Sequence, residues 1–440
     1  MKKHIWKNLD SAARARLLRR PGLEQNEQLQ TDVAAILRTV REGGDQALSA
    51  LTLELDGITL SDFRVDENEF AAAAEALTNR QYEAIEAAAA NIRAFHQAQL
   101  SEPVIVETTP GVVCERVTRP IKNVGLYVPA GSAPLPSTAL MLAIPAAIAG
   151  CDNYLMCTPP QQNGSAHPAV LVAAKICGVQ RVFKLGGAQA IAAMAYGTAT
   201  IPKVQKIFGP GNTWVTTAKA QVSQDPQGAA CDMPAGPSEV LVIADDNANP
   251  SFIASDLLSQ AEHGPDSQVI LIGTSASICD KTLTELETQQ ANLSRRDIVV
   301  QSLANSAAII VDNLDIAIDV ANRYAPEHLI LQIENPRAKI DDIHAAGSVF
   351  LGPWSPEAIG DYCSGTNHVL PTYGFATSHS SLGVNDYLRS MTVQELTAAG
   401  LQSIGPIAET LADLEGLDAH RNAVRTRLKA LADRKSGIRP

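Results

Sequence analysis

The sequence predicts an α/β fold built from two parallel-sheet units, with mainly helical extensions at both ends of the chain. A length of 440 residues exceeds what one compact core usually holds, since domains average roughly 150 residues. Short apolar runs alternate with helical stretches in two successive series, which is typical of parallel sheets covered by helices on both faces. We therefore expect two Rossmann-like units of similar plan.

The N-terminal region, residues 1–110, is expected to be mainly helical. Apolar residues recur at helical spacing over 9–18, where Pro21-Gly22 ends the pattern, and over 33–40, where Gly43-Gly44 ends it. Residues 69–100 contain no proline or glycine and are rich in alanine and glutamate, so they favour a long helix or a helix pair.

The first α/β unit is expected over residues 111–236. Its apolar runs predict strands, the stretches between them predict helices, and a segment rich in Gly, Pro and Asp closes the series. The expected strands are 112–117, 123–128, 154–157, 181–185 and 204–208, with helices at 169–177 and 188–196.

The second α/β unit is expected over residues 237–385, and the C-terminal region, 386–440, turns helical and charged again. That region is short for a core of its own, so we expect it to pack on another surface, such as that of a partner subunit. The expected strands of the second unit are 239–244, 269–272, 307–311, 329–332 and 348–351, with helices at 252–261, 281–292 and 314–324.

Composition and charge exclude several classes of partner. A formal net charge of −12 without a basic run gives little attraction to phosphate backbones, so we expect no nucleic-acid partner. The most apolar run, 139–149, is too short to span a bilayer and contains Pro145, so we expect no membrane association. The N-terminus lacks the apolar stretch of a secretory signal. Seven scattered cysteines without a C-x-x-C pair indicate reduced thiols, and we expect a soluble, cytoplasmic protein.

Three glycine-rich turns follow predicted strands, where open parallel sheets bind their ligands. They are Pro129–Ser132, Gly186–Gln189 and Gly209–Asn212. Their backbone amides are suited to an anion at a helix start, but none completes the G-x-G-x-x-G pattern. Nucleotide binding and plain helix-capping turns both remain open from this pattern alone.

Two polar pairs are candidates for chemistry. Gln260 and His263 are three residues apart near a helix end and share a face, which fits a metal site or ordinary polar packing. Pro326 disfavours a helical Ala325 and predicts extended backbone there. Neighbouring side chains of an extended segment point to opposite sides, so Glu327 and His328 would serve two proton-transfer tasks, or simply form a polar strand entry.

The segment 353–385 is long, irregular and dense in aromatic and polar residues, which favours a functional loop over disorder. Within it, Cys363 and Ser364 lack a nucleophile elbow, and we take both as structural. Further on, Glu415 and His420 by themselves fit a solvated helix entry.

Eight segments, taken together and in chain order, resemble the histidinol dehydrogenase family. The resemblance extends over nearly the whole chain and is more specific than any one motif. The segments are 123–129 (Asn-Val-Gly-Leu-Tyr-Val-Pro), 187–191, 208–212 (Phe-Gly-Pro-Gly-Asn), 232–241, 259–265 (Ser-Gln-Ala-Glu-His-Gly-Pro), 324–328 (Tyr-Ala-Pro-Glu-His), 360–371 and 415–420.

The resemblance implies the roles of individual residues. It implies one Zn²⁺ per subunit, held by Gln260, His263, Asp361 and His420. Substrate contacts would come from these four residues together with Ser238, His328 and Glu415. Contacts to NAD⁺ would come from Tyr127, Gln189 and Asn212. None of the seven cysteines takes a role, and we treat them as structural.

The implied reaction oxidises L-histidinol to L-histidine, the last step of histidine biosynthesis, through bound histidinal and two NAD⁺. His328 would act as base in both oxidations, and Glu327 would activate the water that hydrates the aldehyde. The resemblance also implies a homodimer in which the C-terminal region of one chain, with Glu415 and His420, completes the other chain's site.

Three alternatives stay open. A related NAD-dependent dehydrogenase of another small polyol or amino alcohol would be favoured by loss of Glu415 and His420, yet both are present. A zinc hydrolase using Glu327 would need an open water position and no nicotinamide dependence. A catalytically idle zinc-binding relative is disfavoured by the intact Glu327-His328 pair.

Overall fold

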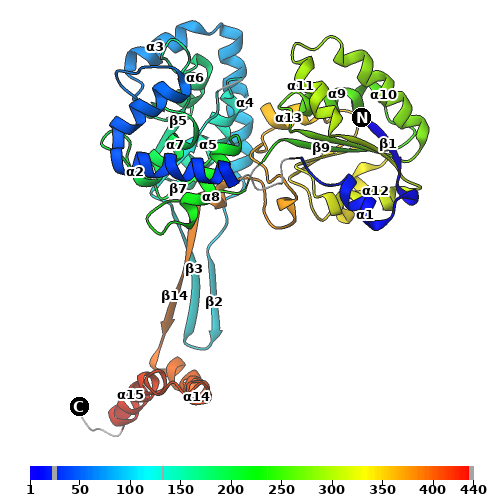
Figure 1. The fold of residues 1–440 in the computed structure, drawn as a ribbon. Coiled ribbons are helices and arrows are strands. Elements are labelled where there is room, and N and C mark those ends of the chain that lie inside the picture. The colour runs from blue at the N-terminus through cyan, green and yellow to red at the C-terminus, as the bar shows by residue number, and fades with distance from the viewer. Residues whose placement is uncertain (22–26, 131–132, 235, 436–440) are drawn as a thin grey trace. The chain divides into compact units, whose positions relative to one another are not determined.

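The computed structural model describes residues 1–21, 27–130, 133–234 and 236–435. It divides into two compact units, the first formed by Met1–Gln99 and Ile121–Tyr387, the second by Leu100–Pro120 and Leu388–Pro440 (Figure 1). Gly22, Gly131 and Ser132, which belong to predicted turns, lie outside the described residues.

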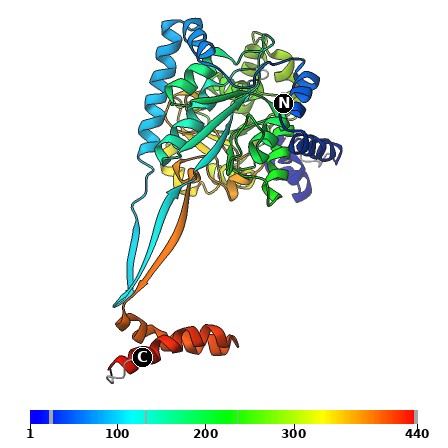
Figure 2. The same ribbon diagram turned by 90° about the vertical axis from the view of Figure 1, so that its left-hand side faces the viewer.

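The N-terminal segment is mainly helical, as predicted, but it begins with a strand. The strand β1 (Lys2–Ile5) is followed by α1 (Ser11–Leu17), α2 (Glu27–Asp56), α3 (Glu67–Ala76) and α4 (Asn79–Gln97). The predicted helix end at Gly43-Gly44 is a kink inside α2, where Gly44 takes a φ of 53° before the helix resumes. The long α4, light blue in Figure 2, packs along α5 (Pro136–Ala149).

Sheet B is the first parallel sheet and lies in the first unit. Its strands are β4 (Asn123–Tyr127), β5 (Asn153–Thr158), β6 (Arg181–Lys184), β7 (Lys206–Phe208) and β8 (Ala230–Cys231), in the order β6-β5-β4-β7-β8. One apolar core joins this sheet to α7 (Gly187–Tyr196), α8 (Thr213–Gln224) and α2. The other helices of this series are α5 and α6 (Pro168–Ile176).

Sheet A is the second parallel sheet. Its order is β1-β11-β10-β9-β12-β13, with β9 (Glu239–Ala244), β10 (Gln268–Gly273), β11 (Ala307–Ile310), β12 (His328–Gln332) and β13 (Ser348–Leu351). Alternate residues of β9 join different cores: Val240 and Val242 pack with α9 (Pro250–Ala261) and α10 (Ala276–Gln290), whereas Leu241 and Ile243 pack with α12 (Leu314–Tyr324). Such two-faced burial is expected of a parallel strand.

Both parallel sheets are doubly wound, which confirms the predicted pair of Rossmann-like units. In each sheet the first strand of the series lies centrally, the next two extend to one side, and the fourth lies on the other side. The strand order therefore reverses between β4 and β7 in sheet B, and between β9 and β12 in sheet A. Crevices at such reversal points are the usual ligand sites of open α/β sheets.

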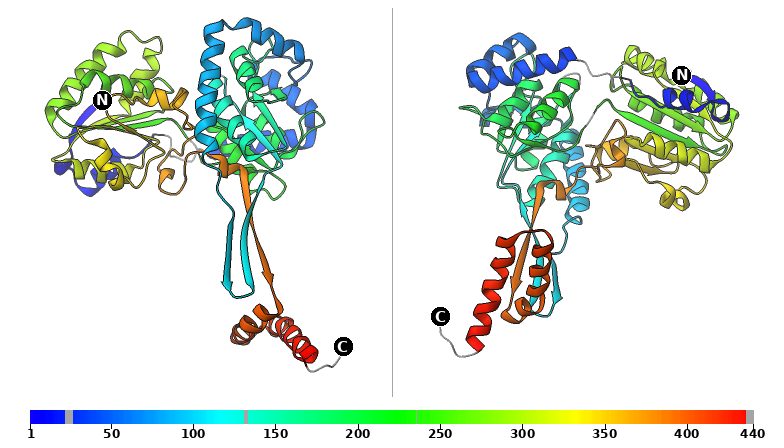
Figure 3. Two further views of the ribbon diagram at one scale, coloured as in Figure 1. Left: turned by 180° about the vertical axis from the view of Figure 1, so that it is seen from behind. Right: turned by 60° about the horizontal axis from the view of Figure 1, so that its bottom comes forward.

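The second unit contains an antiparallel sheet that the sequence analysis did not anticipate. Its strands β2 (Val104–Thr109), β3 (Val112–Pro120) and β14 (Leu388–Leu396) run in the order β14-β3-β2, and α14 (Ala398–Leu414) and α15 (Asp418–Lys435) follow (Figure 3). The run 112–117 was expected among parallel strands, and 388–396 within a helical region. Both expectations are wrong, because strand direction depends on a pairing partner that lies far away in the sequence.

The irregular segment that follows β13 is folded against the body of the first unit. After the short α13 (Glu357–Tyr362), the Asn367 side chain donates to the Met141 carbonyl at 2.8 Å, and the Tyr387 hydroxyl donates to the Leu142 carbonyl at 2.9 Å. The Tyr387 ring also stacks on Phe208 at 3.9 Å. Among the described residues, the helices are each too short or too polar to cross a membrane.

Candidate active site

The Glu327-His328 pair lies where the chain enters β12, at the centre of sheet A. Helix α12 ends at Tyr324, and Ala325 then adopts the left-handed conformation, with a φ of 50°. The expectation of an extended Ala325 is wrong, because this residue caps the helix and donates its N–H to the Ala321 carbonyl at 2.7 Å. An alanine in this region costs about 1–2 kcal/mol. Such strain often marks functional sites.

The two side chains of the pair meet instead of diverging. His328 is the first residue of β12, whereas Glu327 lies before the strand. The rule that successive side chains of a strand point to opposite faces therefore does not cover both residues. The Glu327 Oε2 atom lies 3.5 Å from the His328 Nδ1 atom and accepts the backbone N–H of Glu239 at 2.8 Å. The prediction that neighbouring side chains point to opposite sides is therefore wrong here. Both side chains are buried.

His328 is the centre of a polar cluster. Its Nδ1 atom lies 3.0 Å from the Glu239 carbonyl oxygen and 2.9 Å from Nε2 of Gln260. Its Nε2 atom lies 3.3 Å from Oδ1 of Asp361. The cluster thus brings together Glu327, His328, Gln260 and Asp361, which the sequence places on three separate segments.

Charge and burial act in opposite directions on this cluster. Burial opposes the charged imidazolium, yet the Glu327 and Asp361 carboxylates outweigh it and hold the pKa of His328 well above the ordinary histidine value. Burial raises the pKa of Glu327. For Asp361, burial is outweighed by the neighbouring His328, so the pKa of this carboxyl falls below its ordinary value.

Gln260 and His263 lie at the C-terminal end of α9, beside this cluster. The Gln260 side chain is fully buried, and its Oε1 atom has no hydrogen-bond partner among the described residues. His263 Nδ1 lies 3.5 Å from the Ser238 hydroxyl, and burial lowers the pKa of this histidine while Asp361 acts against that shift. A buried carbonyl oxygen without a donor is unusual. It suits a site where a cation is the missing partner.

The described residues contain no group of three or more His, Cys, Asp or Glu side chains arranged to hold a metal ion. The predicted ligand set differs from such a group in composition, because it includes a glutamine. The set also includes His420, which lies in α15 of the second unit. Glu415, a predicted substrate contact, lies in the same unit at the C-terminal cap of α14. Both side chains are exposed.

The three predicted cofactor contacts follow strands of sheet B. Tyr127 ends β4, Gln189 lies in the first turn of α7 after β6, and Asn212 caps α8 after β7. The Gly187 N–H donates to the Tyr127 hydroxyl at 3.1 Å, and Gln189 Nε2 donates to Asp56 at 3.3 Å. Because carboxyl ends of parallel strands meet at one edge, these residues share the edge that includes the β4–β7 reversal point.

A glycine and a buried ion pair shape the turn that carries Asn212. Gly209 has a φ of 127°, and a Cβ atom there would lie 2.1 Å from the Tyr127 carbonyl oxygen. The Asp232 carboxylate accepts the Gly209 N–H at 2.7 Å and pairs with Lys219, whose ammonium also donates to the Gly209 carbonyl at 2.8 Å. Asn212 therefore starts α8 from a fixed backbone.

Comparison with known proteins identifies the chain's relatives. The family model described as histidinol dehydrogenase matches residues 19–428. Histidinol dehydrogenase of Xanthomonas euvesicatoria is 56% identical over 97% of this chain and 99% of its own length, and that of Vibrio cholerae is 52% identical over 98% and 99%. The chain belongs to the histidinol dehydrogenase family. The crystal structure of histidinol dehydrogenase from Elizabethkingia anophelis superposes with a TM-score of 0.94 at 48% identity, covering 98% of this chain and 99% of that one.

Membership of the histidinol dehydrogenase family confirms the resemblance and places the chain among the oxidoreductases. The zinc hydrolase alternative therefore loses its basis. Sequence reasoning assigned no role to several residues at or near the cluster, although two of them, Glu239 and His368, lie in the segments that carry the resemblance. Glu239 supplies backbone contacts, and His368 lies with Nε2 at 3.1 Å from the Thr138 hydroxyl. Burial raises the pKa of Glu357, which accepts a hydrogen bond from Ser259, to about 8.

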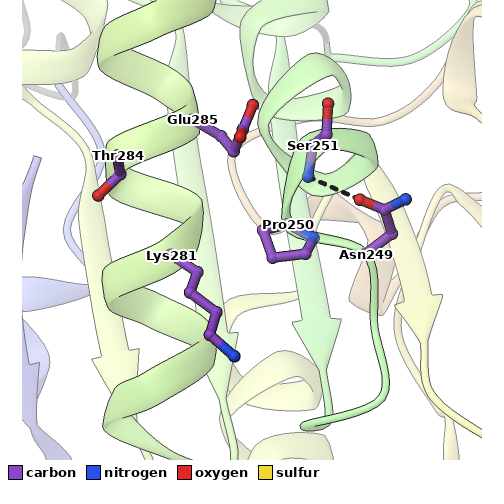
Figure 4. Close-up of a pocket in the computed structure, with 6 residues that line it drawn as sticks. All are labelled: Asn249, Pro250, Ser251, Lys281, Thr284 and Glu285. Atoms are coloured by element: carbon purple, nitrogen blue, oxygen red, sulfur yellow. Dashed lines mark hydrogen bonds between the residues drawn. The ribbon is translucent and has the colours of Figure 1, made fainter.

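A surface pocket of the protein lies away from the cluster around His328. Figure 4 shows it between the start of α9 and α10, lined by Asn249, Pro250, Ser251, Lys281, Thr284 and Glu285. The cluster around His328 instead involves the opposite end of α9, where Gln260 lies. None of the lining residues is a predicted site residue.

Proposed function

We propose that this protein is a cytoplasmic enzyme that oxidises L-histidinol to L-histidine through bound histidinal, reducing two NAD⁺. The observation that carries the proposal is the buried contact of His328 with Glu327, Gln260 and Asp361, in a chain of the histidinol dehydrogenase family. The cluster combines proton-transfer groups with oxygen and nitrogen donors, which suits oxidation of an alcohol that also binds a metal.

Gln260, His263 and Asp361 would hold the zinc ion, and His420 of a second copy would complete the ligand set. The unpartnered Oε1 atom of Gln260 supports this assignment, and nitrogen and oxygen donors suit Zn²⁺. When bound, the cation would anchor the amine and imidazole of histidinol and favour the neutral form of the nearby His328. Ser238, beside His263, would contact the substrate together with His328 and with Glu415 of the second copy.

His328 would accept the alcohol proton through Nε2 while hydride leaves the carbinol carbon for the first NAD⁺, giving the aldehyde. Glu327 would then take a proton from water, whose oxygen adds to the aldehyde carbon, while His328 gives the proton it took from the alcohol to the aldehyde oxygen. This forms the gem-diol and returns His328 to its neutral form. His328 would take a proton from the gem-diol as the second hydride passes to the second NAD⁺, giving the carboxylic acid, which loses its remaining proton to solvent. Burial raises the pKa of the Glu327 carboxyl, which makes its carboxylate a stronger proton acceptor.

Tyr127, Gln189 and Asn212 would bind NAD⁺ at the carboxyl edge of sheet B. Support comes from their position next to the β4–β7 reversal point, which is where doubly wound sheets bind dinucleotides. Tyr127 and Gln189 are buried and held by hydrogen bonds, so they would shape the site, while the exposed Asn212 would approach the cofactor from the α8 N-terminus.

A homodimer with shared active sites is the proposed assembly. The second unit exposes large apolar side chains, among them Ile105 at 64%, Ile407 at 59% and Leu414 at 79%. Apolar surface of this extent usually marks an interface. In the proposed homodimer, the C-terminal region of the other chain, with Glu415 and His420, would complete the cluster around His328.

The first test is the stoichiometry and metal dependence of NADH formation. We expect two NADH per L-histidinol, loss of activity after chelation, and recovery when zinc is added back, because the ligand set around Gln260 binds the cation that anchors the substrate. NADH absorbance with purified protein measures all three. Folded, zinc-replete protein that forms no NADH from histidinol would refute the proposed substrate, and other small alcohols would be tested next.

Mixing two inactive variants tests the shared site. His420→Asn chains keep His328, and His328→Asn chains keep His420, so a mixed dimer has one complete site. Random exchange of equal amounts is expected to restore about a quarter of the parent activity, since half of the dimers are mixed and each has one working site. Each variant alone is the control, and mass spectrometry verifies exchange. Verified exchange without recovery would place the whole site in one chain.

A further inference from the structure

The backbone of Glu239 holds both members of the Glu327-His328 pair. Its N–H donates to Glu327 Oε2 at 2.8 Å, and its carbonyl oxygen lies 3.0 Å from His328 Nδ1. A carbonyl only accepts, so this contact forms when Nδ1 carries a proton. Together with Gln260 Nε2, which lies 2.9 Å from the same nitrogen, it fixes where the imidazole ring lies. The contact to Glu327 occupies one carboxylate oxygen and leaves Oε1 for another partner.

The side chain of Glu239 is in turn held by Arg20, from the segment after α1. The Arg20 Nε atom donates to Glu239 Oε1 at 2.6 Å, and Nη2 donates to Oε2 at 3.0 Å. This forked pairing, which only arginine offers, fixes a carboxylate in orientation as well as in position. The Arg20 side chain is 9% exposed and that of Glu239 is 2% exposed. Two charges so deeply buried are tolerated only as a pair.

Arg20 also contacts the helix end that leads into the pair. Its Nη2 atom donates to the Tyr324 carbonyl at 2.5 Å, and its guanidinium carbon lies 4.0 Å above the centre of the Tyr324 ring. Tyr324 is the last residue of α12, directly before Ala325, Pro326 and Glu327. The Tyr324 hydroxyl donates to Gln268 at 2.9 Å, which anchors the ring itself. Arg20 therefore reaches the pair along two routes, through Glu239 and through Tyr324.

We propose that Arg20 and Glu239 are positioning residues that hold Glu327 and His328 in their reactive arrangement through the Glu239 peptide and the end of α12. The roles of Glu327 and His328 rest on the proposed function, whereas the contacts of Arg20 do not. Arg20→Met leaves the Glu239 carboxylate buried without its cation, on the residue whose backbone N–H holds Glu327. That carboxylate then turns toward solvent or takes up a proton, and in either event the peptide that fixes both side chains shifts.

Kinetics of matched variants test this inference. Arg20→Met is expected to lower kcat for both oxidations by roughly 100-fold and to leave the KM for histidinol within about threefold, because a misplaced catalytic group affects the chemical steps more than binding. The double variant Arg20→Met/Glu239→Gln has no uncompensated charge. In the parent protein the Tyr373 N–H donates to Glu239 Oε1 at 2.8 Å, and the side-chain oxygen of the introduced glutamine can accept the same hydrogen bond. Its kcat is expected to be at least about tenfold higher than that of Arg20→Met.

Arg14→Met is the matched control, since Arg14 also donates to a carbonyl, that of Trp6, and lies over an aromatic ring at 4.8 Å. Its kcat is expected to equal that of the parent. If Arg20→Met does not fold, Arg20→Lys replaces it, with an expected kcat roughly tenfold below the parent because an ammonium lacks the fork. A folded Arg20 variant with parental kcat would overturn the inference. A double variant no better than Arg20→Met would do the same.

Crystal structures of the parent and Arg20→Met separate this inference from the proposed function. We expect the contact between the Glu239 N–H and Glu327 Oε2, 2.8 Å in the parent, to be lost in the variant. An unchanged contact would overturn the positioning role whatever the substrate is. A parent enzyme that does not oxidise histidinol would refute the proposed function and leave this structural comparison intact as a test.

Discussion

His328→Asn is expected to slow both oxidations by roughly 1,000-fold while histidinol binding stays within about threefold of the parent. The asparagine side chain still fills a polar, buried site, but it has no nitrogen that accepts a proton near neutral pH. Gln260, His263 and Asp361, the proposed metal ligands, are unchanged, so substrate binding is retained. Stopped-flow NADH formation gives the rates, and calorimetric titration gives the affinity.

The matched control is His344→Asn, the same substitution at an exposed histidine, which is expected to keep parental rates. An approximately parental rate of either oxidation in His328→Asn would contradict the assignment of His328 as the base of both steps. Loss of histidinol binding together with rate would assign His328 to binding instead.

Glu327→Gln is expected to separate the two oxidations. The amide oxygen still accepts the Glu239 N–H, so the pair keeps its contact to the backbone. The side chain no longer takes a proton from water, so oxidation of histidinal is expected to fall by roughly 100- to 1,000-fold and that of histidinol by less than about tenfold. Supplying histidinal or histidinol in separate assays measures the two steps. The yield of NADH per histidinol falls from two toward one.

Glu334→Gln, at an exposed glutamate just after β12, is the control and is expected to retain both rates. If Glu327→Gln oxidised histidinal at the parental rate, Glu327 would have no part in water activation. Equal losses in both steps would make Glu327 a positioning residue for His328, since the two side chains are in contact.

Local patterns were sufficient for most strands of the two parallel sheets and for several of their helices, because a short apolar strand or an amphipathic helix carries its own periodicity. The strand 239–244, for example, was predicted with the bounds that β9 has. Four strands escaped, namely β1, β2, β8 and β14. β1 is four residues long and begins Lys-Lys-His, β8 has only two residues, and β2 and β14 are mostly exposed, so none of the four shows a buried pattern. Their existence depends on their pairing partners, which are β11 for β1, β3 for β2 and β14, and β7 for β8.

Less of the candidate site than of the fold could be predicted from the residues alone. The resemblance named Gln260, Asp361 and His328, but the spacing of Gln260 and His263 alone favoured ordinary polar packing over metal binding. The contacts among them arise from three elements that meet only in the folded chain. Glu239 and Arg20 were out of reach, because a backbone N–H or carbonyl has no sequence signature and an isolated arginine has no motif. Local rules also failed at Ala325, where a helix cap outweighs the preference imposed by the following proline.

The antiparallel sheet of the second unit has a consequence for biosynthesis of the chain. β2 and β3 form a hairpin early, but β14, which pairs with β3 along nine residues, leaves the ribosome about 270 residues later, or tens of seconds at about 5–20 residues per second. During that delay the β3 edge, with its unpaired N–H and carbonyl groups, is open to strands of neighbouring nascent chains. In a chain that ends before Leu388, the β3 edge would stay unpaired permanently, so the principal defect of such a chain would be aggregation.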